Sequence, residues 1–285
     1  MFAQAPILGS LIEPTGGDLG DYWRLGNIEP LLSKLLAKVR RGEPEMAMDA
    51  IAARGMVDAA TILSRRYTLQ ATNVPFLGRG KQTSALSDFI GRVYEEAKAD
   101  LATAMIARMR KLASECGSIA IVSPQNWYVL DGYRTFRKQL LEEGSLHVVC
   151  DLGPAAFRDM NWWAARTALS VFSNVKPEST QLSLSITLKE HKDTDEKEAL
   201  ARAGNFNLIP QREQRDNPDS RIVAERLSSN DYLVRHCRSR QGIKTGDDAR
   251  YRRNIWEFQN WGELWRKFQS SPDSTAPFGG CSDIV

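Results

Sequence analysis

The sequence has 285 residues, a formal net charge of +3 and 42% apolar residues. This length is enough for one large domain or two modest ones, and the apolar content excludes wholesale disorder. No apolar run approaches the ~20 residues that span a bilayer, and the first residues lack the basic head of a signal peptide. We therefore expect a soluble, cytoplasmic protein without a membrane partner.

Cysteine and histidine are sparse, with four cysteines and three histidines. The cysteines form no C-x-x-C pair, so their spacing matches neither a common zinc motif nor a disulfide framework. We expect buried reduced thiols and no metal site.

The first 65 residues predict helices after a loop. Residues 1–20 are rich in glycine and proline and predict a loop or frayed start. Leucines recur at helical spacing over 28–41, and Gly42 follows two arginines, which is typical of a helix end. A second helix is expected over 45–65. We expect residues 1–65 to form a helical N-terminal segment.

From residue 66 to 190 the predicted elements alternate between strands and helices. A strand is expected first, then a long helix that Ser84 or Ser87 caps and Gly117 ends. The last expected strand alternates strictly and predicts one exposed face. Such a succession is typical of an open α/β sheet with helices on its faces. The expected strands are 67–72, 118–123, 147–152, 167–172 and 182–188, and the expected helices are 88–114 and 133–143.

The residue composition changes again near a run of mixed charges at 189–197, which predicts a solvated linker. We expect a domain boundary there and a mixed α+β segment over 200–285. A basic stretch over 235–253, with aromatic residues in and after it, is compatible with contacts to a phosphate backbone. Surface charge that is balanced elsewhere explains the same stretch, because the whole chain is nearly neutral.

Asn73, Val74, Pro75 and Phe76 follow the first expected strand and so lie at the carboxyl edge of the sheet, where α/β sheets bind ligands. An asparagine side chain and a backbone carbonyl both accept hydrogen bonds from an exocyclic amine. An aromatic ring offers a face on which a flat base can stack, after the base has been flipped out of its duplex. Taken alone, the tetrapeptide is also an ordinary exit from a strand into a turn.

The sequence assigns no functional role to two other residues. Trp127 is expected to pack in the core rather than to contact bases. Asp151 has no partner that the sequence identifies.

The stretch from Tyr67 to Asn174 resembles the second half of the catalytic domain in adenine-specific DNA methyltransferases of the restriction–modification and bacteriophage-exclusion (BREX) type. Asn73, Pro75 and Phe76 match that family's Asn-Pro-Pro-Tyr or Asn-Pro-Pro-Phe motif, while Val74 replaces a proline. In the family this proline's carbonyl accepts the amine hydrogen bond, and a valine carbonyl can do the same. The residues Tyr67-Thr68 depart from the family's usual Tyr-Asp.

Further segments resemble the same family in a consistent order, which is more specific than any single motif. They are 78–82, 97–101, 117–127, 133–141, 151–153 with Phe157, 242–247, and 256–257.

The resemblance implies a partial Rossmann-like sheet of the class I S-adenosylmethionine-dependent methyltransferases over 66–190, with three parallel strands beside an antiparallel one. Residues 200–285 would begin a DNA target-recognition domain. The implied reaction moves a methyl group from S-adenosyl-L-methionine to the exocyclic amine of adenine in double-stranded DNA. Asn73 and the Val74 carbonyl would orient the amine, Pro75 would shape the turn, and Phe76 would stack on the base. Arg79, Lys81 and Lys244 are candidates for contacts with DNA, and a solvated loop explains Arg79 and Lys81 equally well.

The family's glycine-rich cofactor turn has no counterpart before Asn73, since Gly9-Ser10 and Gly16-Gly17 do not follow a predicted strand. We therefore expect a fragment: a truncated enzyme, or one piece of a split enzyme whose partners are the missing N-terminal half or other defence subunits. One alternative is an inactive DNA- or partner-binding fragment of a phage-defence complex. Another is a methyltransferase that acts on glutamine or RNA, although the recognition-like sequence after residue 240 disfavours it.

Overall fold

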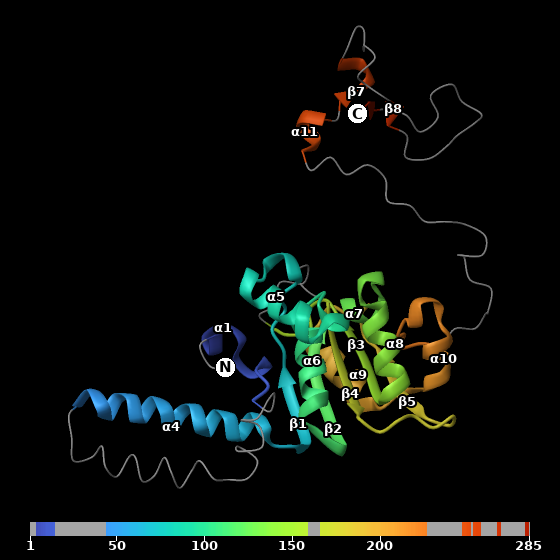
Figure 1. Cartoon of the computed structure of the whole chain (residues 1–285). Coiled ribbons are helices and arrows are strands. Elements are labelled where there is room, and N and C mark those ends of the chain that lie inside the picture. Colours follow the sequence, from blue (N-terminus) through green and yellow to red (C-terminus); the bar gives the residue numbers. More distant parts are fainter. Residues whose placement is uncertain are drawn as a thin grey trace. The chain divides into compact units, whose positions relative to one another are not determined.

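The structure is a computed structural model, and it forms two compact units, Met1–Arg226 and Leu227–Val285 (Figure 1). The residues it describes are 4–14, 44–158, 166–226, 247–251, 253–257, 267–268 and 283–284. The helix expected over 28–41 and the site residue Lys244 lie outside the described residues.

A six-stranded mixed sheet organises the first unit, with strand order β1-β2-β4-β3-β5-β6. Strands β1, β2, β3 and β5 run in one direction, while β4 and β6 run in the other. The strands are β1 (Tyr67–Asn73), β2 (Ala113–Pro124), β3 (Ser145–Gly153), β4 (Thr167–Ser173), β5 (Leu182–Thr187) and β6 (Asn207–Pro210).

This sheet confirms the expected α/β architecture, in which parallel strands lie beside an antiparallel one. Four of the five predicted strands run in one direction, where the sequence predicts three. The antiparallel strand β4 lies between β2 and β3 and pairs with both. The last predicted strand is β5, but its exposure reverses the one that its alternating sequence predicts, since Leu182 and Leu184 are exposed whereas Ser183 and Ser185 are buried.

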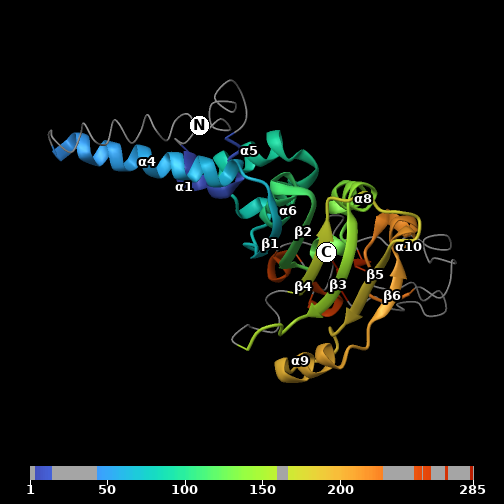
Figure 2. The ribbon, with the colours of Figure 1, turned by 90° about the horizontal axis from the view of Figure 1, so that it is seen from below.

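Helices from the middle of the chain cover one face of the sheet. Ile119, Ile121 and Phe172 from the sheet pack with side chains of α6 and α8 in the main core. On the other face, a small cluster around Cys150 and Ile186 packs against Leu200 of α9, and Figure 2 shows α9 on the opposite side of the sheet from α8. The helices concerned are α5 (Ser84–Val93), α6 (Leu101–Leu112), α7 (Asn126–Val129), α8 (Arg134–Glu143) and α9 (Thr194–Ala203).

The long helix expected over 88–114 is wrong as a single element, because the chain forms two helices there. Thr83 caps α5 by accepting the Leu86 N–H, and Asp100 caps α6 by accepting the Ala102 N–H. The helix also stops before Gly117, which lies inside β2. A Cβ atom on Gly117 would approach the Tyr67 carbonyl oxygen to 2.6 Å, so this glycine allows β1 and β2 to lie close together.

The N-terminal segment differs from the loop that its composition predicts. Residues 4–14 form α1 (Ala5–Leu8) and a 3₁₀ turn (Gly9–Leu11). Leu8, Leu11 and Ile12 are buried in the main core. Burial of these three side chains overrides the local preference for a loop. The next helix, α4 (Pro44–Ser64), confirms the helix expected over 45–65.

The division between the two units lies later than the charge run where we expected a domain boundary. Strand β6 pairs with β5, so residues 207–210 belong to the sheet, and α10 (Gln211–Asp216) follows within the same unit. The last residues of the charge run form the start of α9. One of them, Lys197, is buried and donates hydrogen bonds to the carbonyls of Leu152 and Pro154.

The second unit contains a short helix and a small sheet of strand order β7-β9-β8 among its described residues. Its elements are α11 (Asp248–Tyr251), β7 (Arg253–Asn254), β8 (Lys267–Phe268) and β9 (Asp283–Ile284). In the part of the chain that the structure describes, no helix combines the length and apolar character that a membrane crossing requires.

Candidate functional site

Asn73 is the last residue of β1 and lies at the carboxyl edge of the sheet, as the sequence predicts. Its side chain is exposed, and no hydrogen bond to the described residues holds its amide. An amide with free acceptor and donor positions at a strand end is available to a ligand.

Val74 and Pro75 end the pairing between β1 and β2. The Val74 N–H donates to the Val122 carbonyl at 3.1 Å, and the Val74 side chain is buried. Beyond that bond, Pro75 and Pro124 have no N–H to continue the ladder. The tetrapeptide therefore leaves the sheet where Asn73 ends it, with Val74 as its anchor in the core.

Phe76 is 37% exposed, which leaves part of its ring open to a stacking partner. The residues after it are fixed to the start of α6: the Leu77 carbonyl accepts the Leu101 N–H at 3.0 Å, and the Arg79 N–H donates to the Ala99 carbonyl at 3.1 Å. Gly78 and Asp100 form an isolated antiparallel bridge between the same two segments. These contacts hold the loop and so present Phe76 from a fixed backbone.

Asp100 is the centre of this clamp. It is buried, its Oδ1 atom accepts the Ala102 N–H at 2.7 Å, and burial raises the pKa of its carboxyl group. Asp100 lies in a segment that resembles the methyltransferase family, but the single helix predicted over 88–114 includes it as an interior residue and not as a cap.

The structure describes two of the three residues that are expected to contact DNA. Arg79 and Lys81 lie in a 3₁₀ turn (Arg79–Lys81) and both are exposed. The Arg79 guanidinium donates a hydrogen bond to the Lys98 carbonyl at 3.4 Å. The Lys81 side chain makes no hydrogen bond or ion pair with the described residues. Lys244 lies outside the described residues.

A second polar group lies at the same sheet edge, where β2 and β3 end. The Gln125 amide donates to the Asp151 carboxylate at 2.7 Å, and the Gly153 N–H donates to the other carboxylate oxygen at 3.1 Å. Burial raises the pKa of Asp151. The sequence identifies no partner for Asp151, because the pairing of β4 with both β2 and β3 is what brings Gln125 and Asp151 together.

The tryptophan next to this group has a structural role. Trp127 is buried, and its indole N–H donates to the Ser123 hydroxyl at 2.9 Å. It also packs edge-to-face on Phe136. The expectation that Trp127 packs in the core is confirmed.

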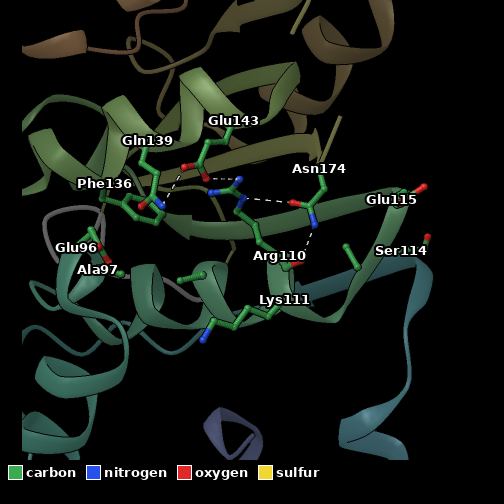
Figure 3. Close-up of a pocket in the computed structure, with 12 residues that line it drawn as sticks. Glu96, Ala97, Arg110, Lys111, Ser114, Glu115, Phe136, Gln139, Glu143 and Asn174 are labelled. Carbon is green, nitrogen blue, oxygen red and sulfur yellow. Dashed lines mark hydrogen bonds and ion pairs between the residues drawn. The ribbon is translucent and has the colours of Figure 1, made fainter. Parts of the chain in front are cut away.

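A cavity of about 560 Å³ lies at the opposite edge of the sheet. Ser114 and Glu115 at the start of β2 line it, and Figure 3 shows Arg110 reaching between Glu143 and Asn174, with contacts of 3.1 and 3.2 Å. Because Asn73 stands at the carboxyl edge, this cavity does not serve the tetrapeptide.

The described residues do not fit S-adenosylmethionine by themselves. A cofactor turn needs glycines that leave room for close approach beside the catalytic strand. The described glycines with positive φ are Gly9, Gly153 and Gly204. Gly204 is the C-cap of α9, and the space beside Gly153 is filled by Lys189. Gly9 is the first residue of a 3₁₀ turn that follows α1, and no strand precedes it among the described residues.

The described residues also contain no group of three or more His, Cys, Asp or Glu side chains that could hold a metal ion. Of the two described cysteines, Cys150 is buried as expected and Cys116 is exposed.

No protein-family model matches the chain. Among curated proteins, it is 24% identical over 220 residues to the adenine-specific methyltransferase PglX of Lacticaseibacillus casei (strain Zhang), covering 72% of this chain and 18% of PglX. It is 25% identical over 174 residues to the adenine-specific methyltransferase BrxX of Escherichia coli O9:H4 (strain HS), covering 61% of this chain and 14% of BrxX. The chain thus spans less than a fifth of the length of these relatives.

Solved structures with a partial likeness come from restriction–modification enzymes. The type I methyltransferase subunit from Streptococcus thermophilus has a TM-score of 0.40 at 17% identity, covering 54% of this chain and 37% of its own. The Type ISP enzyme LlaBIII bound to DNA has a TM-score of 0.43 at 16% identity, covering 72% of this chain and 16% of its own.

The resemblance expected from the sequence is confirmed at the level of sequence similarity. The chain is similar, over most of its own length and a small part of theirs, to adenine-specific methyltransferases of the PglX and BrxX kind.

Proposed function

We propose that this chain is the catalytic half of an adenine-specific DNA methyltransferase, which methylates the exocyclic amine of adenine with S-adenosylmethionine as the methyl donor. One observation carries the proposal. The free amide of Asn73 ends β1, and the partly open ring of Phe76 follows it three residues later. The chain that carries them is similar to two adenine-specific methyltransferases.

The residues of the tetrapeptide have distinct roles in this proposal. The Asn73 amide oxygen and the Val74 carbonyl accept the two hydrogens of the adenine amine, which leaves the nitrogen lone pair directed at the incoming methyl group. Pro75 restricts the backbone between Val74 and Phe76, and Phe76 stacks on the base. A base inside a duplex cannot reach these atoms, so the adenine must be flipped out of double-stranded DNA.

The cations near the tetrapeptide favour DNA as the substrate. Lys81 is exposed and without a side-chain contact in the described structure, so it is free to bind a phosphate next to the flipped base. Arg79 can join it by releasing its contact with the Lys98 carbonyl. Lys244 remains part of the proposal on its sequence position alone, as does the assignment of residues 200–285 to target recognition.

We expect Phe76→Ala to weaken the preference of the chain for DNA that presents an unpaired adenine. Stacking of a base on an aromatic side chain contributes ~1–3 kcal/mol, so the adenine-over-abasic ratio of dissociation constants should fall about 5- to 150-fold. Fluorescence anisotropy with two duplexes, one carrying an unpaired adenine and the other an abasic site in its place, measures this ratio.

The matched control is Phe157→Ala, another exposed phenylalanine (44% exposed) on a different loop at the same sheet edge. It should leave the ratio unchanged. An equal fall for both variants, or a fall in thermal stability that accompanies the Phe76→Ala effect, would contradict a stacking role.

A second candidate function is favoured by the poor fit to the cofactor. The chain would then contribute DNA or partner contacts to a defence complex without performing catalysis. Both functions predict DNA binding, but only the first predicts that adenine methylation appears when a cofactor-binding partner is added. On either candidate, the cytoplasm as its compartment and other defence subunits as partners are proposals that rest on the named relatives.

A further inference from the structure

The loops that leave the carboxyl edge of the sheet share one feature. Each loop after β1, β2 and β3 exposes one large apolar side chain among its described residues, and these side chains are Phe76, Leu130 and Phe157. A single exposed apolar residue needs no explanation, but this edge is where α/β sheets bind their ligands. The proposed function uses Phe76 alone and leaves the other two without a role.

The strand order distinguishes Leu130 from Phe157. β1 and β2 are parallel neighbours, with Asn73 opposite Val122, so the loops that follow them leave the sheet about 5 Å apart. β4 lies between β2 and β3, which places the end of β3 three strand spacings, about 14 Å, from β1. Of the three loops, the one that carries Leu130 is therefore the direct neighbour of the tetrapeptide.

The clamp at Asp100 connects these two neighbouring loops. Its backbone holds the loop after the tetrapeptide through the bridge to Gly78. Tyr133, three residues after Leu130, is buried, and its pKa is raised to about 12, first by burial and then by the nearby Asp100 carboxylate. The loop that carries Leu130 thus lies beside the clamp that fixes the residues after Phe76.

The backbone of Leu130 is fixed, although its side chain is 50% exposed. Its N–H donates to the Asn126 carbonyl at 3.0 Å, and its carbonyl accepts the Arg137 guanidinium at 2.5 Å. Arg137 is fully buried and also donates to the carbonyls of Trp127 and Asp219, at 3.0 and 2.9 Å. An apolar side chain on such a backbone loses little freedom when it binds, so it is preorganised to enter an apolar site.

Base flipping creates an apolar site of the kind that Leu130 fits. Removal of an adenine from the stack leaves a gap between two base pairs, and apolar side chains such as leucine insert between base steps in DNA complexes. Asp131, next to Leu130, is exposed and repels phosphates, but an exposed cation offsets it on the same edge. This cation is Arg166, whose carbonyl accepts the Gln125 N–H at 2.8 Å and which can bind a flanking phosphate.

We propose that Leu130 enters the DNA base stack at the gap left by the flipped adenine. The loop after β1 then holds the base, while the loop after β2 keeps the base pairs on either side of the gap from closing. This inference rests on the proposed function and adds a second DNA contact to the same site. Because Leu130 fills the gap and does not touch the adenine, its contribution is separate from stacking on Phe76.

Fluorescence anisotropy with the full chain tests the contact on two duplexes that differ at one position. One duplex is fully paired, and the other carries an abasic site, which presents the gap without a base that could stack on Phe76. Leu130→Ala should lower the paired-over-abasic ratio of dissociation constants about 3- to 10-fold, the range expected when half of a leucine side chain is no longer buried. Leu130→Met keeps an apolar side chain of similar size and should keep the ratio of the parent.

The matched control is Leu182→Ala, which truncates a leucine of similar exposure (46%) at the opposite edge of the sheet, where β5 begins. It should leave the paired-over-abasic ratio unchanged. The Leu130 side chain is half exposed, so the fold should tolerate its truncation. Leu130→Ala should also leave the adenine-over-abasic ratio unchanged, because both of those duplexes offer the same gap.

Three results would overturn the inference and leave the proposed function intact. One is a parent chain that binds the paired and the abasic duplex equally well. Another is a paired-over-abasic ratio that Leu130→Ala does not change, which would assign the exposed leucine to a protein contact instead. The third is an equal fall for Leu182→Ala. Failure of the Phe76→Ala measurement would contradict the proposed function separately, and a parent chain that binds no DNA would contradict both.

Discussion

Replacing Asn73 by alanine should lower the rate of adenine methylation by about 10²–10³-fold, the typical cost of removing one preorganised hydrogen-bonding group from a reacting centre. The assay is transfer of a labelled methyl group to DNA by the chain assembled with its cofactor-binding partner. Since the Asn73 side chain is exposed and makes no hydrogen bond with the described residues, the free energy of unfolding should stay within about 0.5 kcal/mol of the parent.

Two further variants separate a chemical role of Asn73 from a general disturbance of β1. Asn73→Asp keeps an oxygen acceptor in the same place, so it should lose less activity than Asn73→Ala. Thr68→Ala changes another exposed residue of β1 and should leave the rate unchanged. Equal losses in Asn73→Ala and Asn73→Asp would show that acceptance of the amine hydrogen is not what Asn73 contributes.

The sequence predicts the strands well because burial leaves a strong pattern. The apolar run of β2 and the alternation of β5 each predict a strand that the structure contains. The place of Asn73 at a strand end follows from the same pattern, because Pro75 cannot extend a ladder. Local signals of this kind need no knowledge of distant residues.

The elements that the sequence mispredicts depend on competing or distant contacts. The break between α5 and α6 has a local signal, since Asp100 directly precedes the apolar run of α6 and can cap it. The apolar stripe that continues through the break predicts one helix instead. The sequence predicts that Gly117 ends a helix. In the structure a glycine is required at this position because a Cβ atom would collide with the carbonyl oxygen of Tyr67 on another strand.

The sequence names the residues of the candidate site but does not predict the contacts that hold them in place. The four residues of the tetrapeptide follow from sequence and resemblance. The clamp between Leu77 and Leu101, and the pair of Gln125 with Asp151, join segments that lie apart in the sequence.

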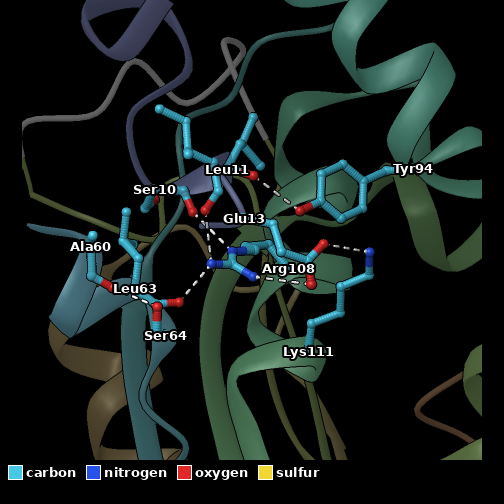
Figure 4. A network of polar contacts seen from close by, with 10 residues as sticks. Ser10, Leu11, Glu13, Ala60, Leu63, Ser64, Tyr94, Arg108 and Lys111 are labelled. Carbon is cyan, nitrogen blue, oxygen red and sulfur yellow. Dashed lines mark hydrogen bonds and ion pairs between the residues drawn. The ribbon is translucent and has the colours of Figure 1, made fainter. Parts of the chain in front are cut away.

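Replacing Arg108 by alanine should lower the free energy of unfolding by about 3–5 kcal/mol, the usual cost of removing one member of a buried charged network. Arg108 is 2% exposed, and burial lowers the pKa of its guanidinium. Its donors reach the carbonyls of Ser10, Ile12 and Leu63 at 3.1, 2.8 and 2.9 Å. Figure 4 shows the Arg108 guanidinium between Ser10 and Leu63. The alanine variant leaves all three carbonyls without this partner.

Urea denaturation of the purified chain measures the loss. Arg108→Lys should fall between the parent and Arg108→Ala, because an ammonium keeps the charge but not the planar fork that serves three carbonyls. The matched control is Arg54→Ala, since Arg54 pairs with Asp58 on the surface of α4 at 3.8 Å. That change should cost no more than about 0.5 kcal/mol. A loss below about 1 kcal/mol for Arg108→Ala would contradict the role of the network.

The network also links the stability of the N-terminal segment to the site. Through Ser10 and Ile12 it fixes residues 4–14 on α6, and through Leu63 it fixes the end of α4 three residues before β1 begins. Loss of Arg108 should therefore expose residues 4–14 to protease and speed hydrogen exchange at the start of β1. Unchanged exchange at Tyr67–Leu69 in Arg108→Ala would contradict this link between the network and the site.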